Sequence, residues 1–125
     1  MERISPVVTS LFIRRGDICL VDFKKNEGSE QDGLRPALVL QNNTGNRFSS
    51  TVVVCPITSA KKQFGATHVT LFPNECGIQK TSIVLCEQIR AIDKSRIRKK
   101  VGNLCSPEKL IEVEKRMAFL LGLNA

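Results

Sequence analysis

Short apolar runs, separated by polar and glycine-containing stretches, make up most of the chain. Several runs are rich in β-branched residues or alternate between apolar and polar positions, which is typical of strands buried on one or both faces. They predict strands over residues 16–23, 37–41, 51–57, 67–72 and 82–92, the last bent near Glu87. Between the second and third strands, residues 42–50 contain Asn and Gly side by side, which predicts a turn.

The last part of the chain has helical spacing instead. Apolar residues recur every three or four positions and predict one buried helix face, formed by Leu110, Val113, Met117 and Leu121. Ser106 is a suitable N-cap, Pro107 suits the first helical position, and Gly122 predicts the end of the helix. Asp93 is also placed to cap a short helical turn over residues 94–97.

Strands followed by one terminal helix predict a mainly β fold, with a small curled or barrel-like sheet and the helix packed on it. The 125 residues suit a single domain, which we expect at 14–125 after an N-terminal tail at 1–13. No apolar run approaches the 18 residues of a membrane span, and the tail lacks the apolar stretch of a signal peptide. We therefore expect a cytoplasmic protein with no membrane segment.

The net charge is +7, from 19 Lys and Arg against 12 Asp and Glu, and it favours a polyanionic partner. Six of the basic residues lie between positions 90 and 100, where Asp93 is the one acid. This cluster has two interpretations, a binding surface and a solvated face, and the pattern does not choose between them. The chain has no Trp or Tyr, so binding of a nucleic acid would depend on charge and hydrogen bonds rather than on extensive base stacking.

The five cysteines include no C-x-x-C pair, and His68 is the only histidine. This excludes a disulfide framework and a typical zinc set. Cys19, Cys55 and Cys86 lie inside apolar runs, which predicts reduced thiols in the core of a cytosolic protein.

Several blocks in a fixed order carry a more specific signal. They are Arg15-Gly16-Asp17 before the first strand, residues 28–42 with Arg35-Pro36, then Pro56-Ile57-Thr58, and Glu87-Gln88-Ile89-Arg90. In this order and spacing, residues 14–122 resemble the MazF/PemK family of toxins from bacterial toxin–antitoxin pairs, and in particular its Gram-positive MazF type.

The resemblance implies an SH3-like (CcdB/PemK-like) β-barrel with a C-terminal helix, assembled as a homodimer. It also implies a sequence-specific endoribonuclease that needs no metal or other cofactor and cuts single-stranded RNA, chiefly mRNA. The products would be a 2′,3′-cyclic phosphate and a 5′-hydroxyl, and growth would stop until a cognate antitoxin protein binds. By the same resemblance Arg35 and Thr58 are catalytic, and the RNA-contacting positions are Ser29, Glu30, Gln31 and Gln88.

The chemistry of these residue types fits the implied reaction. Attack of a 2′-hydroxyl on phosphorus builds negative charge on the phosphoryl oxygens, which a guanidinium and a hydroxyl can stabilise. Arginine is a poor general base, so we assign charge stabilisation to Arg35. His68 has the chemistry of a base, but a purely structural role for this histidine stays open.

Three alternatives remain at the level of the sequence. CcdB toxins share the barrel but poison gyrase through protein contacts, so a protein-binding gyrase poison is the main alternative. A non-catalytic RNA-binding module would need only the positive charge. A metal nuclease is conceivable on three acidic residues of one polar loop, although such a cluster is more often a solvated segment: Glu27, Glu30 and Asp32.

Overall fold

The computed structural model describes residues 12–24, 33–59, 65–104 and 106–123. Its strands are β1 (Asp17–Asp22), β2 (Leu34–Val39), β3 (Thr51–Ser59), β4 (His68–Leu71), β5 (Ser82–Leu85), β6 (Arg90–Asp93) and β7 (Ile97–Asn103). The helical segments are α2 (Asn43–Phe48), α3 (Pro107–Leu121) and two one-turn 3-10 helices, η1 (Cys86–Gln88) and η2 (Lys94–Arg96).

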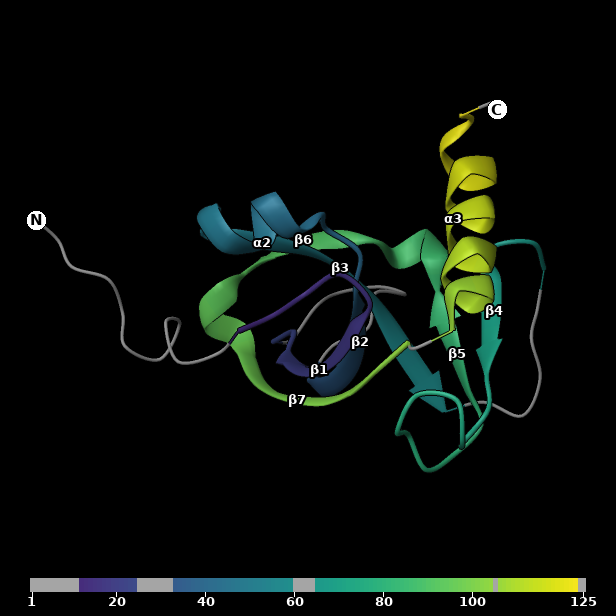
Figure 1. The fold of residues 1–125 in the computed structure, drawn as a ribbon, viewed down its shortest axis with the longest axis horizontal. Helices are drawn as coiled ribbons and strands as arrows, with labels where there is room; N and C mark the ends of the chain where they lie inside the picture. Colours follow the sequence, from purple (N-terminus) through teal and green to yellow (C-terminus); the bar gives the residue numbers. More distant parts are fainter. Residues whose placement is uncertain (1–11, 25–32, 60–64, 105, 124–125) are drawn as a thin grey trace, which may run out of the picture.

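All paired strands run antiparallel, in the order β4-β5-β3-β2-β1-β7, and β6 also pairs with β3. The chain passes from β6 through η2 directly into β7, so the sheet curls until these two edge strands are joined end to end. Figure 1 shows the resulting ring of β1, β2, β3, β6 and β7, with β4, β5 and α3 standing beside it. This open barrel with a C-terminal helix confirms the predicted fold class.

Alternation along the strands fills two separate cores, one on each face of the sheet. We call the first the barrel core, enclosed by the ring: Ile13, Cys19, Val21, Phe23, Ala37, Val39, Val52, Val54, Ile92 and Ile97. The second, the helix core, lies between the sheet and α3: Ile18, Leu38, Cys55, Ile57, Val69, Leu71, Cys76, Val84, Cys86, Leu104 and Val113. Strand β3 contributes to both cores and therefore connects them.

Helix α3 begins and ends as its sequence predicts. The Ser106 hydroxyl accepts a hydrogen bond from the Lys109 N–H, Pro107 is the first helical residue, and Gly122 ends the helix at φ 71°. Val113 is fully buried, and Leu110 and Met117 pack against the helix core. The predicted face is wrong only at its last position, since Leu121 is 54% exposed near the end of the helix.

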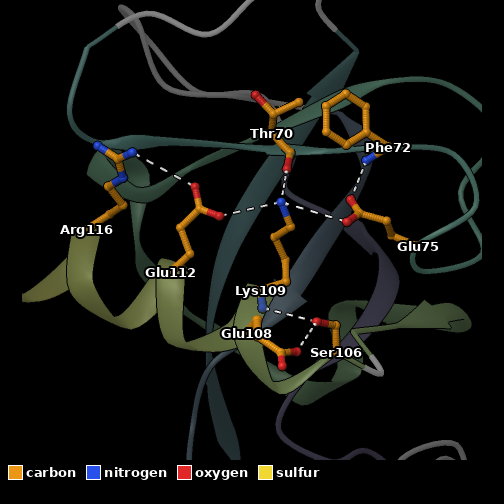
Figure 2. Close-up of polar contacts among 8 residues, drawn as sticks. All are labelled: Thr70, Phe72, Glu75, Ser106, Glu108, Lys109, Glu112 and Arg116. Carbon is orange, nitrogen blue, oxygen red and sulfur yellow. Dashed lines mark hydrogen bonds and ion pairs between the residues drawn. The ribbon is translucent and has the colours of Figure 1, made fainter.

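One lysine fastens α3 to β4, as Figure 2 shows. Lys109 Nζ donates a hydrogen bond of 2.9 Å to the carbonyl oxygen of Thr70 on β4. The same nitrogen lies 3.5 Å from Glu112 and 3.8 Å from Glu75, and 5.7 Å from the ring centre of Phe72. The ammonium group is thus surrounded by a carbonyl oxygen and two carboxylates, while the aliphatic part of the side chain is largely buried.

The structure corrects three predicted elements. Residues 42–50 hold the short helix α2 rather than a plain turn, because the Asn42 side chain caps the Gly45 N–H at 2.8 Å. The predicted strand over 82–92 is divided by η1 into β5 and β6. Strand β7 was not predicted, because its run of Arg and Lys gives no apolar alternation. The short turn capped by Asp93 is confirmed as η2.

In the part of the chain that the structure describes, no helix is long and apolar enough to cross a membrane.

Candidate active site

Arg35 and Thr58 lie just beyond the end of the β2–β3 ladder. The cross-strand pairs are Ala37–Pro56, Leu38–Cys55 and Val39–Val54. The last observed pair is Ala37–Pro56. Extending the same register by two residues would place Arg35 opposite Thr58. Both residues then share the sheet face of Ala37 and Pro56, since side chains alternate along each strand. Two residues that are far apart in the sequence thus lie at the same end of the barrel, just beyond the last β2–β3 pair, Ala37–Pro56.

The sheet changes its pairing at this same point. Strand β3 pairs with β2 up to Pro56 and with β5 from Ile57 onward. Proline has no N–H to donate, so a ladder ends readily beside it. The first residues of β2 and the last residues of β3 are therefore not paired with each other, and both Arg35 and Thr58 are half-buried rather than sealed in the core. This opening gives a substrate access to the two side chains.

Gln88 lies in η1, next to a small polar cluster. Glu87 accepts a hydrogen bond of 3.1 Å from the Thr67 hydroxyl, and its other carboxylate oxygen lies 3.1 Å from His68 Nε2. This cluster ties the start of β4 to η1. Gln88 is half-buried beside it, three residues after β5, the strand that pairs with β3 at Thr58.

His68 shares the sheet face of Thr58 but not its position. Thr58 pairs with Ile83, and Leu85, two residues further on, pairs with His68. Strand β5 separates the two residues, and neighbouring strands lie about 4.8 Å apart, so roughly 10 Å of sheet lies between them. A general base needs hydrogen-bond distance to the proton that it removes. The structure thus favours an organising role for His68 over a base that serves the Arg35–Thr58 pair.

Other predicted residues lie outside the described part of the chain. These are the RNA-contacting candidates Ser29, Glu30 and Gln31, and the alternative metal-site candidates Glu27 and Asp32. Among the described residues, no group of three His, Cys, Asp or Glu side chains is arranged to hold a metal ion.

The cysteines fit the prediction of core thiols. Cys19, Cys55, Cys76 and Cys86 are free and buried. Burial, reinforced by Asp17, raises the pKa of the Cys19 thiol to about 11. A hydrogen bond with Cys86, together with burial, raises the pKa of Cys55 far above its usual range. These two thiols are therefore protonated at neutral pH and are poor nucleophiles.

Arg90 belongs to the basic segment 90–100 and also ends the Glu87-Gln88-Ile89-Arg90 block. In the structure it stands apart from that segment, because its guanidinium carbon lies 5.3 Å from the ring centre of Phe23 on the barrel side of the sheet. Two other basic residues of the segment form ion pairs instead: Arg98 pairs with Asp22 near the surface and Lys100 pairs with the buried Asp17, each at 3.0 Å.

Comparison with known proteins agrees with this fold. The chain is 44% identical over 113 residues to the endoribonuclease MazF of Staphylococcus epidermidis, a match that covers 90% of this chain and 93% of that protein. The crystal structure of MazF from Deinococcus radiodurans is similar with a TM-score of 0.76 and 30% identity, over 89% of this chain and 97% of that one. A MazE–MazF crystal structure from the same organism gives a TM-score of 0.72 and 30% identity, over 90% of this chain and 98% of the matched chain. The family of PemK-like, MazF-like toxins of type II toxin–antitoxin systems matches residues 14–121, and this chain belongs to it.

Proposed function

We propose that this chain is an endoribonuclease toxin that cuts single-stranded RNA, chiefly mRNA, at specific sequences and without a metal ion. The observation that supports the proposal is that Arg35 and Thr58 both lie just beyond the last β2–β3 pair, Ala37–Pro56, where β3 leaves β2. Membership in the toxin family and the similarity to an endoribonuclease support it.

In the proposed reaction the 2′-oxygen of a ribose forms a bond to the adjacent phosphorus while the bond from phosphorus to the 5′-oxygen breaks. The 2′-hydroxyl gives up its proton, and the departing 5′-oxygen takes one up. The products are a 2′,3′-cyclic phosphate and a 5′-hydroxyl. Arg35 stabilises the negative charge that develops on the phosphoryl oxygens, and the Thr58 hydroxyl donates a hydrogen bond to one of them.

The proposal includes two protein partners. A second copy of the chain would form a homodimer, and a cognate antitoxin would bind and inhibit the toxin, as the MazE–MazF crystal structure from Deinococcus radiodurans suggests by its two components. An acidic antitoxin segment is expected, because the chain carries a net charge of +7.

The test is cleavage of a long single-stranded RNA in EDTA, with mapping of the 5′ ends. Thr58→Val keeps the shape of the side chain but removes the hydroxyl, and Thr51→Val is the matched control at the other end of β3, where Thr51 is exposed. Loss of one transition-state donor typically lowers the rate by about 10²- to 10³-fold. We expect a loss of this size in Thr58→Val and in Arg35→Lys, with Thr51→Val near the wild-type rate.

A folded wild-type protein that leaves RNA intact contradicts the proposal. A gyrase-inhibition assay then distinguishes the protein-binding poison from an inactive RNA-binding module.

A further inference from the structure

The positively charged side chain of Arg90 is partly buried in the barrel. Arg90 is the first residue of β6 and pairs with Val54, so its side chain lies on the same sheet face as the barrel core. Its Nη1 atom is buried and has no hydrogen-bond partner, and no other buried side-chain nitrogen or oxygen in the described part of the chain is in this state. Burying a polar group without a partner is unfavourable, and more so when the group is charged.

The guanidinium lies at the same end of the barrel as the proposed catalytic pair. It stacks on Phe23, whose N–H donates to the Gly33 carbonyl at 2.9 Å. Along the same ladder Val21 pairs with Arg35, so Phe23 and Arg35 are diagonal neighbours on one sheet face. Arg90, Phe23 and Arg35 therefore converge where the β2–β3 ladder stops short of Thr58.

Nearby acidic groups are occupied by other partners. Asp22, which precedes Phe23, receives Arg98 at 3.0 Å and the Lys24 N–H at 2.9 Å. Asp93, at the other end of β6, caps the Ser95 N–H at 2.9 Å. The charge of Arg90 is thus not neutralised by either of these carboxylates, while the ring of Phe23 restricts where the guanidinium can lie.

We infer that Arg90 binds a phosphate group of the RNA strand beside the Arg35–Thr58 pair, with Phe23 holding its guanidinium in place. The inference rests on the proposed function. Arg90 as a whole is half-buried, so part of the side chain remains accessible. A phosphate at the accessible edge supplies the opposite charge that no described carboxylate gives this cation, and the planar fork of arginine matches phosphate oxygens. Because the ring already orders the side chain, little further freedom is lost on binding.

The test compares Arg90→Gln with Arg47→Gln. Arg47 is a matched control, because its guanidinium also lies 5.3 Å from a phenylalanine ring, that of Phe48, and the same single charge is removed. It belongs to α2, which follows the opposite end of β2 from Arg35. Affinity is measured at several salt concentrations on an RNA with 2′-deoxy substitutions, which prevent cleavage, and cleavage rates are measured on the unmodified RNA.

We expect Arg90→Gln to weaken RNA binding about 10- to 100-fold, as for loss of a charged hydrogen bond. The slope of log affinity against log salt should fall by about 0.7, the value for one phosphate contact with a single strand. Arg90→Lys should keep the slope but bind less tightly, because it retains the charge without the fork. Phe23→Leu should lower affinity with the slope retained. Arg47→Gln should match the wild type in both quantities.

A merely structural Arg90 would change the unfolding temperature but not the salt slope, so thermal unfolding is measured on every variant. If Arg90→Gln fails to fold, Arg90→Lys carries the comparison, and wild-type affinity in that variant overturns the inference. Unchanged affinity and slope in a folded Arg90→Gln also overturn it, as does loss of antitoxin binding with RNA binding intact. Wild-type protein that neither binds nor cuts RNA instead refutes the proposed function.

Discussion

At the scale of single residues, a close backbone contact requires glycine at position 102. Gly102 lies near the end of β7, where the turn at Cys76 and Gly77 crosses the strand. A Cβ atom on Gly102 would stand 1.9 Å from the carbonyl oxygen of Cys76, far inside contact distance. That same carbonyl accepts the Asn103 N–H at 3.2 Å, so it cannot move away without losing a hydrogen bond.

We therefore predict that Gly102→Ala destabilises the fold by about 1–3 kcal/mol or more, the usual cost of overpacking against a rigid neighbour. The comparison is Gly45→Ala in α2, where the atoms nearest to the new Cβ belong to the Gln41 side chain, at 2.9–3.0 Å, and not to the backbone, so a smaller loss is expected. Urea unfolding followed by far-ultraviolet circular dichroism gives both values. Equal stability of Gly102→Ala and wild type would show that the turn at Cys76 and Gly77 can shift away from the new Cβ atom without loss of folding free energy.

At the scale of elements, α3 is held by both apolar burial and one polar contact. Val113 is its fully buried residue, while Lys109 reaches the backbone of β4 at Thr70. Figure 2 shows how Glu75, Glu112 and Thr70 surround the lysine nitrogen, and how Arg116 extends the network from Glu112. Since the Lys109 side chain is only 14% exposed, this contact is screened less than an ordinary surface ion pair.

Lys109→Met should lower the free energy of unfolding by about 1–3 kcal/mol, because it keeps the buried stem but leaves the Thr70 carbonyl without its donor. Lys115→Met, at an exposed position of the same helix, should stay within about 0.5 kcal/mol of wild type. The measurement is chemical denaturation of the three proteins at one pH and salt concentration. If Lys109→Met is as stable as Lys115→Met, apolar packing alone holds α3 on the sheet.

At the scale of the whole molecule, the two cores share their strands. In β1, Ile18 faces the helix core and Cys19 faces the barrel core, and β3 divides its residues in the same way. Neither core can open without exposing strands that support the other. The molecule should therefore unfold in one cooperative transition, as small single domains usually do.

Val113→Ala tests whether the helix core and the barrel core unfold together, by weakening the helix core. It removes two methyl groups from the helix core and should cost about 2 kcal/mol. Amide hydrogen exchange should report the same loss of protection in α3 and at the Val21 amide of β1, which belongs to the barrel core. Ile111→Ala, at a 47% exposed position of α3, is the control. Loss of protection confined to α3 would show that the helix opens independently.

The sequence by itself determined the elements whose signals are local. Helix α3 follows from the Ser106 cap, Pro107, Gly122 and the repeat of apolar residues, and the apolar strands follow from β-branched runs. It missed β7 because a solvent-exposed edge strand of Arg and Lys carries no apolar alternation. It identified Arg35 and Thr58 only through resemblance to a family, and that assignment stays a prediction.

Only the tertiary structure decided which of these residues meet. Arg35 and Thr58 both lie just beyond the last β2–β3 pair, Ala37–Pro56, and strand β5 lies between Thr58 and His68. The tertiary structure also distinguished Arg90, stacked on Phe23, from basic neighbours that form ion pairs with carboxylates. Local propensity acts over a few residues, whereas register and the meeting of distant side chains depend on how strands pair across the whole chain. For that reason the candidate residues could be identified from the sequence, but their arrangement in space could not.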